Sequence, residues 1–189
     1  MNSLVVSEEE GDYGHGGGLA SDIRAAETLN LNIDARVMAR ENKDASVLDG
    51  YRNRMTISAS YLASETVQIQ LSSTISTEET KTNIQNNRDY SMNASINKTF
   101  KAPFDLIKGP LSVGLSFGGG FREYAGPNPA IDPDTTRNDY TLRLSPSLTV
   151  PAGDTMAILV SGGFTRVDSN IPNSEYVNIS LTIGISKQF

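Results

Sequence analysis

From Leu29 onward, apolar and polar residues alternate with a period of two, and this alternation recurs in eight separate runs. In the first run, Leu29, Leu31 and Ile33 fall on one face, while Asn30 and Asn32 fall on the other. A period of two places successive side chains on opposite faces of a β-strand, and helical spacing fits none of the eight runs. The sequence therefore predicts an all-β chain in which eight strands follow one another.

The connections between the runs alternate in length. Short connections occur at Ser64-Glu65 and at Pro151–Asp154, and the latter carries a strong turn signal. Longer polar connections occur at 41–50, 78–88, 125–137 and 168–175. The connection at 101–110 is the exception, because its place in the series calls for a short turn. Short turns at one end and long loops at the other are typical of antiparallel up-and-down barrels that cross the bacterial outer membrane.

Aromatic residues on the apolar face gather near the ends of the runs, where a lipid-facing wall meets the membrane interfaces. The residues expected near the long loops are Tyr51, Tyr90, Phe121, Tyr140 and Phe164, and those expected near the short turns are Tyr61, Phe100 and Phe189. Charges on this face also lie near strand ends: Lys98, Lys187, Glu123 and Arg166. A soluble barrel with its apolar face inward would show the same alternation, and the two patterns of end residues favour the membrane barrel.

The last run resembles the C-terminal strand of bacterial outer-membrane β-barrel proteins. It alternates from Tyr176 to Ile185 and finishes on Phe189. Members of that class commonly end on such a strand, which the insertion machinery reads. The resemblance implies a transmembrane barrel in the bacterial outer membrane, with membrane lipids, including lipopolysaccharide, and the insertion machinery as partners. A periplasmic or outer-membrane protein partner is a further expectation.

Residues 1–28 differ from the rest of the chain. The stretch 7–18 is acidic and rich in glycine, a composition that favours flexibility. Residues 20–28 predict a short helix with Ser21 as its cap. The expected organisation is a flexible N-terminal segment over 1–28, acting as a plug or a linker, and a barrel over 29–189. Because Met1 is followed by polar and acidic residues, we expect either a mature form or a form made for recombinant expression.

Composition excludes several classes of function. The chain has no cysteine and a single histidine, His15, so thiolate metal sites and a Ser–His dyad on the barrel wall are excluded. The net charge of −6 argues against nucleic-acid binding. We expect no enzymatic activity, no cofactor and no metal. The loop Asp132-Pro133-Asp134 offers two carboxylates, but calcium requires six or more oxygens, so a solvated loop is expected there.

The polar face supplies the candidate functional residues. Those predicted to line the lumen are Asp34, Arg36, Arg40, Arg54, Arg122, Asp139 and Arg143. We expect Asp34 and Asp139 to be the partners of the arginines. Two functions remain open. The first is a narrow passive channel or translocation conduit for small or anionic solutes. The second is a non-catalytic anchor, adhesion or assembly-partner barrel with a filled lumen, and such a barrel could be one subunit of a larger complex. The arginines near the long loops also predict a collar that faces lipopolysaccharide: Arg40, Arg52, Arg54, Arg88, Arg122, Arg137 and Arg166.

Overall fold

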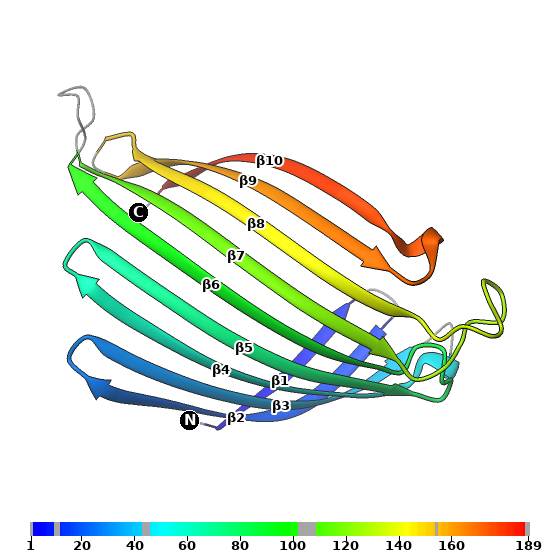
Figure 1. Cartoon of the computed structure of the whole chain (residues 1–189). Coiled ribbons are helices and arrows are strands. Elements are labelled where there is room, and N and C mark those ends of the chain that lie inside the picture. The colour runs from blue at the N-terminus through cyan, green and yellow to red at the C-terminus, as the bar shows by residue number, and fades with distance from the viewer. Residues whose placement is uncertain (1, 10–11, 43–45, 102–108, 154, 188–189) are drawn as a thin grey trace.

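The computed structural model describes residues 2–9, 12–42, 46–101, 109–153 and 155–187. These residues form one antiparallel sheet of ten strands arranged in sequence order (Figure 1). The strands are β1 (Asn2–Glu9), β2 (Asp12–Ala26), β3 (Leu29–Asn42), β4 (Gly50–Ser64), β5 (Val67–Thr80), β6 (Asn87–Lys101), β7 (Pro110–Tyr124), β8 (Asn138–Pro151), β9 (Met156–Ser169) and β10 (Tyr176–Lys187). The predicted all-β, up-and-down architecture is confirmed.

The eight runs of alternating residues correspond to β3 through β10. The predicted strand count of eight was wrong, because the N-terminal segment contributes two more strands. The short helix predicted over 20–28 is also wrong: these residues continue β2 up to Ala26, which then turns into β3. Glycine explains the error, since a Cβ on Gly18 would lie 2.9 Å from the backbone oxygen of Ala35. What suggests flexibility in the sequence permits close strand approach in the sheet.

The sheet is curled but open. In the view of Figure 1, β1 and β2 lie behind the middle strands, and β10 forms the opposite edge. Among the described residues, β1 pairs only with β2, and β10 pairs only with β9. The closed barrel expected from the sequence is therefore not present as a complete ring of strand pairs.

The strands are staggered along the sheet. Tyr176, the first residue of β10, lies in the same cross-strand row as Asp34 of β3, which is eight residues from the end of that strand at Asn42. Seven strand steps therefore shift the strand ends by about one residue per step. With about 3.3 Å per residue along a strand and about 4.8 Å between strands, the strands tilt by about 38° from the axis of the curl. Barrel strands tilt by about 35–45°.

The two ends of the sheet differ. The tight connections at 27–28 and 65–66 lie at one end, which we call the turn end. The connection from β8 to β9 is at the same end; Gly153 has φ +101° there, and residue 154 lies outside the described residues. The long connections lie at the other end, the loop end, and include two short 3-10 helices, η1 (Ser46–Leu48) and η2 (Pro172–Ser174). Most of the connection from β6 to β7 lies outside the described residues. No helix in the described part of the chain is both long and apolar enough to cross a membrane.

Candidate functional site

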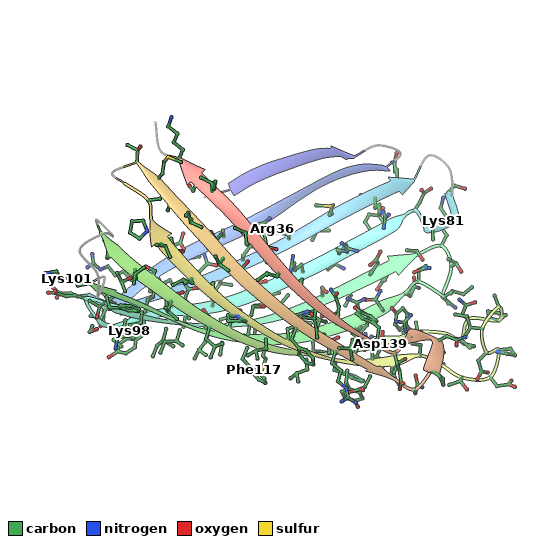
Figure 2. The ribbon with its side chains drawn as sticks, turned by 90° about the horizontal axis from the view of Figure 1, so that it is seen from above. Arg36, Lys81, Lys98, Lys101, Phe117 and Asp139 are labelled. Atoms are coloured by element: carbon green, nitrogen blue, oxygen red, sulfur yellow. The ribbon has the colours of Figure 1, made fainter. Side chains whose placement is uncertain are left out.

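The sheet has one apolar face and one polar face. Register places Leu31, Ala59, Leu71, Ala94, Phe117, Leu144, Phe164 and Ile179 in a single row across eight strands. The neighbouring row on the other face carries Asn30, Ser60, Gln70, Ser95, Ser116 and Ser145. Figure 2 shows Phe117 on the outside of the curl and Arg36 on its inside. The apolar face is therefore convex and the polar face is concave.

No layer of the described chain covers the apolar face. Phe117 is 54% exposed, Leu71 is 54% exposed and Ile179 is 77% exposed. The only buried large apolar side chains among the described residues are Leu111, Val167 and Ile171. A sheet of this size that leaves one whole face apolar and uncovered requires another medium or molecule to cover that face.

The aromatic residues expected at the interfaces lie on the apolar face where the structure describes them. Tyr90, Phe121 and Tyr140 form one row near the loop end, and the rings of Phe121 and Tyr140 are 4.9 Å apart. Tyr51 lies nearer the loop end, whereas Tyr61 and Phe100 lie near the turn end. Phe164 lies deeper than expected, in the row of Phe117, and Phe189 is outside the described residues.

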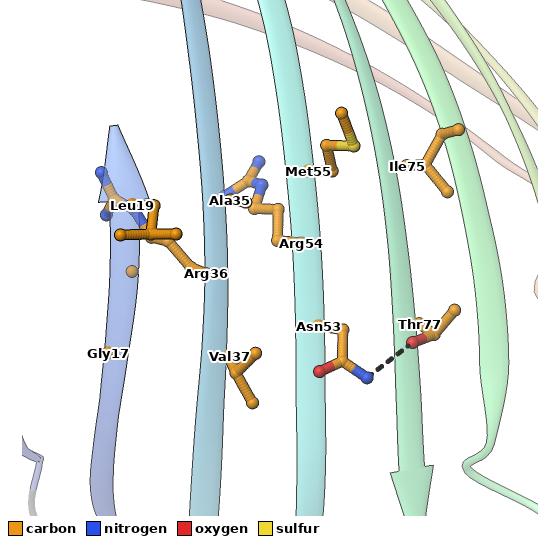
Figure 3. Close-up of a pocket in the computed structure, with 11 residues that line it drawn as sticks. Gly17, Leu19, Ala35, Arg36, Val37, Asn53, Arg54, Met55, Ile75 and Thr77 are labelled. Carbon is orange, nitrogen blue, oxygen red and sulfur yellow. Dashed lines mark hydrogen bonds between the residues drawn. The ribbon is translucent and has the colours of Figure 1, made fainter. Parts of the chain in front are cut away.

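Small residues leave a groove of about 770 Å³ on the apolar face (Figure 3). Gly17 and Ala35 form part of it, between the larger side chains of Leu19, Val37 and Met55. Toward the loop end, the Asn53 amide donates to the Thr77 hydroxyl at 3.2 Å, so this groove ends on polar groups. The rest of the groove is lined by apolar side chains, like the rest of the convex face.

The concave face encloses a polar cavity of about 350 Å³ near the loop end. Side chains from every strand between β4 and β10 line it, which requires the sheet to curl around it. Its charged lining residues are Arg52, Arg54, Glu78, Asp89, Arg122, Arg137, Asp139 and Arg143. Five arginines against three carboxylates give this lining a net charge of +2, in a chain whose overall charge is −6.

Each of the three carboxylates is already bound by an arginine. Arg52 lies 2.7 Å from Glu78, Arg122 lies 2.8 Å from Asp89, and Arg137 lies 2.7 Å from Asp139. We call these three pairs the ion-pair collar. The sequence predicts Arg122 on the polar face, where the structure has it, but does not identify Asp89 as its partner. The alternation in the sequence begins at Tyr90, whereas β6 begins at Asn87, so Asp89 lies in the strand but outside the alternating run.

The predicted lumen residues separate into paired and unpaired groups. Arg36 pairs with Asp34 at 2.8 Å, and Arg40 lies 3.6 Å from Glu78. Asp139 was expected to pair with one of the arginines predicted to line the lumen. It pairs instead with Arg137, which the sequence predicts only for the arginine collar that faces lipopolysaccharide. Arg54 and Arg143 form no ion pair within the described part of the chain. These two guanidinium groups supply the excess positive charge of the cavity.

The Arg137–Asp139 pair is the most buried of the three ion pairs in the cavity. The Asp139 side chain is only 5% exposed, and both of its oxygens accept hydrogen bonds from Arg137, at 2.8 Å from Nε and 2.7 Å from Nη2. The Arg137 guanidinium also lies 4.9 Å from the centre of the Tyr124 ring. The hydrogen bond to Asp139 is the main cause of a raised pKa of Arg137, so this guanidinium is a permanent positive charge in the cavity lining.

The arginine collar predicted to face lipopolysaccharide is divided between the two faces. Four of its members lie on the concave face of the sheet: Arg40, Arg52, Arg54 and Arg122. Arg137, which precedes β8, lines the polar cavity on that face. Of the seven predicted members, only Arg88 and Arg166 lie on the convex face, and Arg166 pairs with Asp168 at 2.7 Å. The parity of each position in its strand decides this split, and a count of arginines near the loop end does not reveal it.

The loop with the Asp132-Pro133-Asp134 sequence uses its carboxylate internally. The backbone N–H of Asp134 donates to the Asp132 carboxylate at 2.9 Å, and this bond is the main cause of the lowered pKa of Asp132. No group of three or more potential metal-ligating His, Cys, Asp or Glu side chains occurs in the described part of the chain.

Neither a comparison with models of known protein families nor one with curated protein sequences finds a match to this chain. Its function must therefore be argued from the two faces of the sheet and from the polar cavity.

Proposed function

We propose that this chain forms the wall of a transmembrane β-barrel in the bacterial outer membrane and conducts small anionic solutes through its lumen. The observation that carries the proposal is the uncovered apolar convex face opposite a polar, positively charged concave face. Lipid acyl chains are the medium that suits the first face, and water and ions suit the second. We propose no catalytic role.

The height of the apolar band supports the membrane assignment. On β7 the band runs from Leu111 to Phe121, before Glu123 ends it. These ten residue steps cover about 33 Å along the strand, or about 26 Å along the barrel axis at a tilt of about 38°. The apolar band of outer-membrane barrels is about 25 Å tall.

A soluble barrel would carry the opposite arrangement. Its apolar face would fill the interior, and its convex face would carry charged residues. Here the cavity is lined by arginine, carboxylate and hydroxyl groups, while Leu71, Phe117 and Leu144 lie on the outside. This inversion favours the membrane barrel over the soluble one.

Single-tryptophan variants test which face meets lipid, because the chain has no native tryptophan. Leu144 and Ser145 are the two central residues of β8 and lie on opposite faces. In vesicles of brominated lipid, the fluorescence of Leu144→Trp should be quenched, while that of Ser145→Trp should persist. Equal quenching of the two variants, or quenching of Ser145→Trp alone, contradicts the membrane assignment.

The channel proposal also requires a closed lumen. The row of Tyr176 continues to Ala20 on β2, eight residues from Asp12 at the loop end of that strand. The eight steps from β2 to β10 therefore carry a stagger of one residue each, which gives ten residues over ten strands, and β1 runs antiparallel to β10. Ile179 lies in the row of Leu31; ten residues further along β3 is Glu41, whose row includes Glu8 of β1. Closure on this stagger would pair Ile179 with Glu8 and Leu181 with Val6.

Cysteine pairs test this closure in a chain that has no cysteine of its own. Val6→Cys with Leu181→Cys should form a disulfide within one chain in reconstituted protein. Val6→Cys with Ile185→Cys is the out-of-register control and should not. Disulfides between chains would instead favour the alternative of a subunit in a larger barrel.

Conductance in a planar lipid bilayer separates the channel from the filled-lumen anchor. Discrete current steps with a preference for anions are expected, because the lining of the cavity carries a net positive charge. A silent bilayer, with insertion confirmed by the tryptophan variants, would refute the channel and favour the non-catalytic anchor or assembly barrel.

A further inference from the structure

Two arginines of the cavity form no ion pair with any described residue, and they lie on different strands. Arg54 is on β4 and Arg143 is on β8, four strand steps apart, and both line the same cavity. Every carboxylate of that lining belongs to the ion-pair collar. Two cations that have no ion-pair partner in the described part of the chain, in a partly enclosed space, favour an anion that brings two negative charges.

The stagger of the sheet places these two arginines at the same level. Through β5, β6 and β7, the row of Arg54 reaches Asp139 on β8. Four steps with one residue of stagger each bring that row four residues closer to the loop end. Arg143 lies four residues from Asp139 toward the turn end, and this difference cancels the stagger. Arg54 and Arg143 therefore form one level of the lumen, below the ion-pair collar.

Hydroxyl groups complete the lining at this depth. Thr74, Ser91 and Thr141 contribute side chains to the cavity and are able to donate to an oxyanion. A volume of about 350 Å³ lies at the low end of the range for ligand pockets, which is about 300–1,000 Å³. The cavity suits a small anion with some water and is too small for an oligomer.

We propose that Arg54 and Arg143 form a two-point binding site for a small dianionic oxyanion, either a phosphate or a dicarboxylate. This inference rests on the proposed function, because it assumes that the concave face becomes a solvent-filled lumen. Each guanidinium binds one side of the anion, and the ion-pair collar keeps the nearby carboxylates from competing for Arg54 and Arg143.

Binding is measured directly by titration calorimetry on the full chain folded in detergent micelles. Orthophosphate and succinate are the two probes, and acetate is the monoanionic control. Saturable binding of one dianion, stronger than that of acetate, is expected, and the better probe identifies the chemical class. Arg54→Gln and Arg143→Gln should each weaken it roughly tenfold to a hundredfold, the usual range for losing a charged hydrogen-bonding partner. Arg166→Gln removes the same charge from the convex face and should leave binding unchanged.

Folding of each variant is checked by circular dichroism, and Arg54→Lys and Arg143→Lys keep the charge if a glutamine variant fails to fold. The site is refuted if Arg54→Gln and Arg143→Gln bind the dianion as tightly as the wild type does. It is also refuted if the wild type binds acetate as tightly as the dianion. Bilayer recordings separate this failure from that of the channel. A conducting barrel without dianion binding refutes the site alone, whereas dianion binding in a silent barrel refutes conduction alone.

Discussion

A single arginine placed on the convex face tests the central claim of lipid contact. Phe117 is the middle residue of β7 and is 54% exposed. Phe117→Arg would place a charge near the bilayer midplane, where an arginine on a barrel's lipid face costs about 2–4 kcal/mol. Val113 lies four residues away, about 13 Å along the strand and about 10 Å along the membrane normal at the tilt derived above. At that depth Val113→Arg should cost about 0–1 kcal/mol.

The free energy of unfolding is measured by urea titration in lipid vesicles, followed by far-ultraviolet circular dichroism. Ser145→Arg places the same charge at the centre of the neighbouring strand on the concave face, where it should cost much less than Phe117→Arg. If the convex face met water, Phe117→Arg would change stability by about 0.5 kcal/mol or less, as most surface substitutions do. Equal free energies for Phe117→Arg and Ser145→Arg would therefore refute the assignment of lipid to the convex face.

Three further predictions concern the cavity, the strand pairing and the longest described loop. Arg137→Gln should destabilise the fold by about 3 kcal/mol, since it leaves the 5%-exposed Asp139 carboxylate without its cation; urea titration checks this, and Arg137→Gln with Asp139→Asn should recover part of the loss. Gly50→Ala should cost about 3 kcal/mol, because the added Cβ overlaps the backbone oxygen of Glu79, whereas Gly184→Ala meets nothing within 4 Å and should be neutral in the same titration. Because the folded-state pKa of Asp132 is lowered from 3.8, its contribution to loop stability is present above that value and is lost as pH falls through the lower folded pKa; carboxyl chemical shifts that titrate at 3.8 or above would contradict this.

Most of the strands are visible in the sequence because each of β3 to β10 alternates over its own length. β1 and β2 are not, since the glycines that let β2 approach β3 closely also remove the apolar residues that make a period visible. Parity also fixed which arginines face inward. The alternation within a strand does not predict which carboxylate pairs with each arginine, because that depends on the register between strands. Arg122 meets Asp89 only because of the register between β6 and β7, which are joined by a connection long enough to permit several registers.

One geometric quantity, the stagger of about one residue per strand, links the convex face to the cavity. It sets the tilt that gives the apolar band a height close to that of outer-membrane barrels. The same stagger brings Arg54 and Arg143 to one level, although they belong to different cross-strand rows. With no stagger, Arg143 would lie four residues below Arg54, about 13 Å along the strand, too far for one small anion to bridge them. The disulfide between positions 6 and 181 therefore tests more than closure. If the disulfide forms to position 179 or 183 instead, the stagger around the ring differs by two residues. Over the four steps from β4 to β8, that difference changes the offset between Arg54 and Arg143 by less than one residue, about 3 Å along the strand, so both arginines would still reach one anion. A register that differs by two residues therefore changes the tilt of the strands but keeps the two-point site.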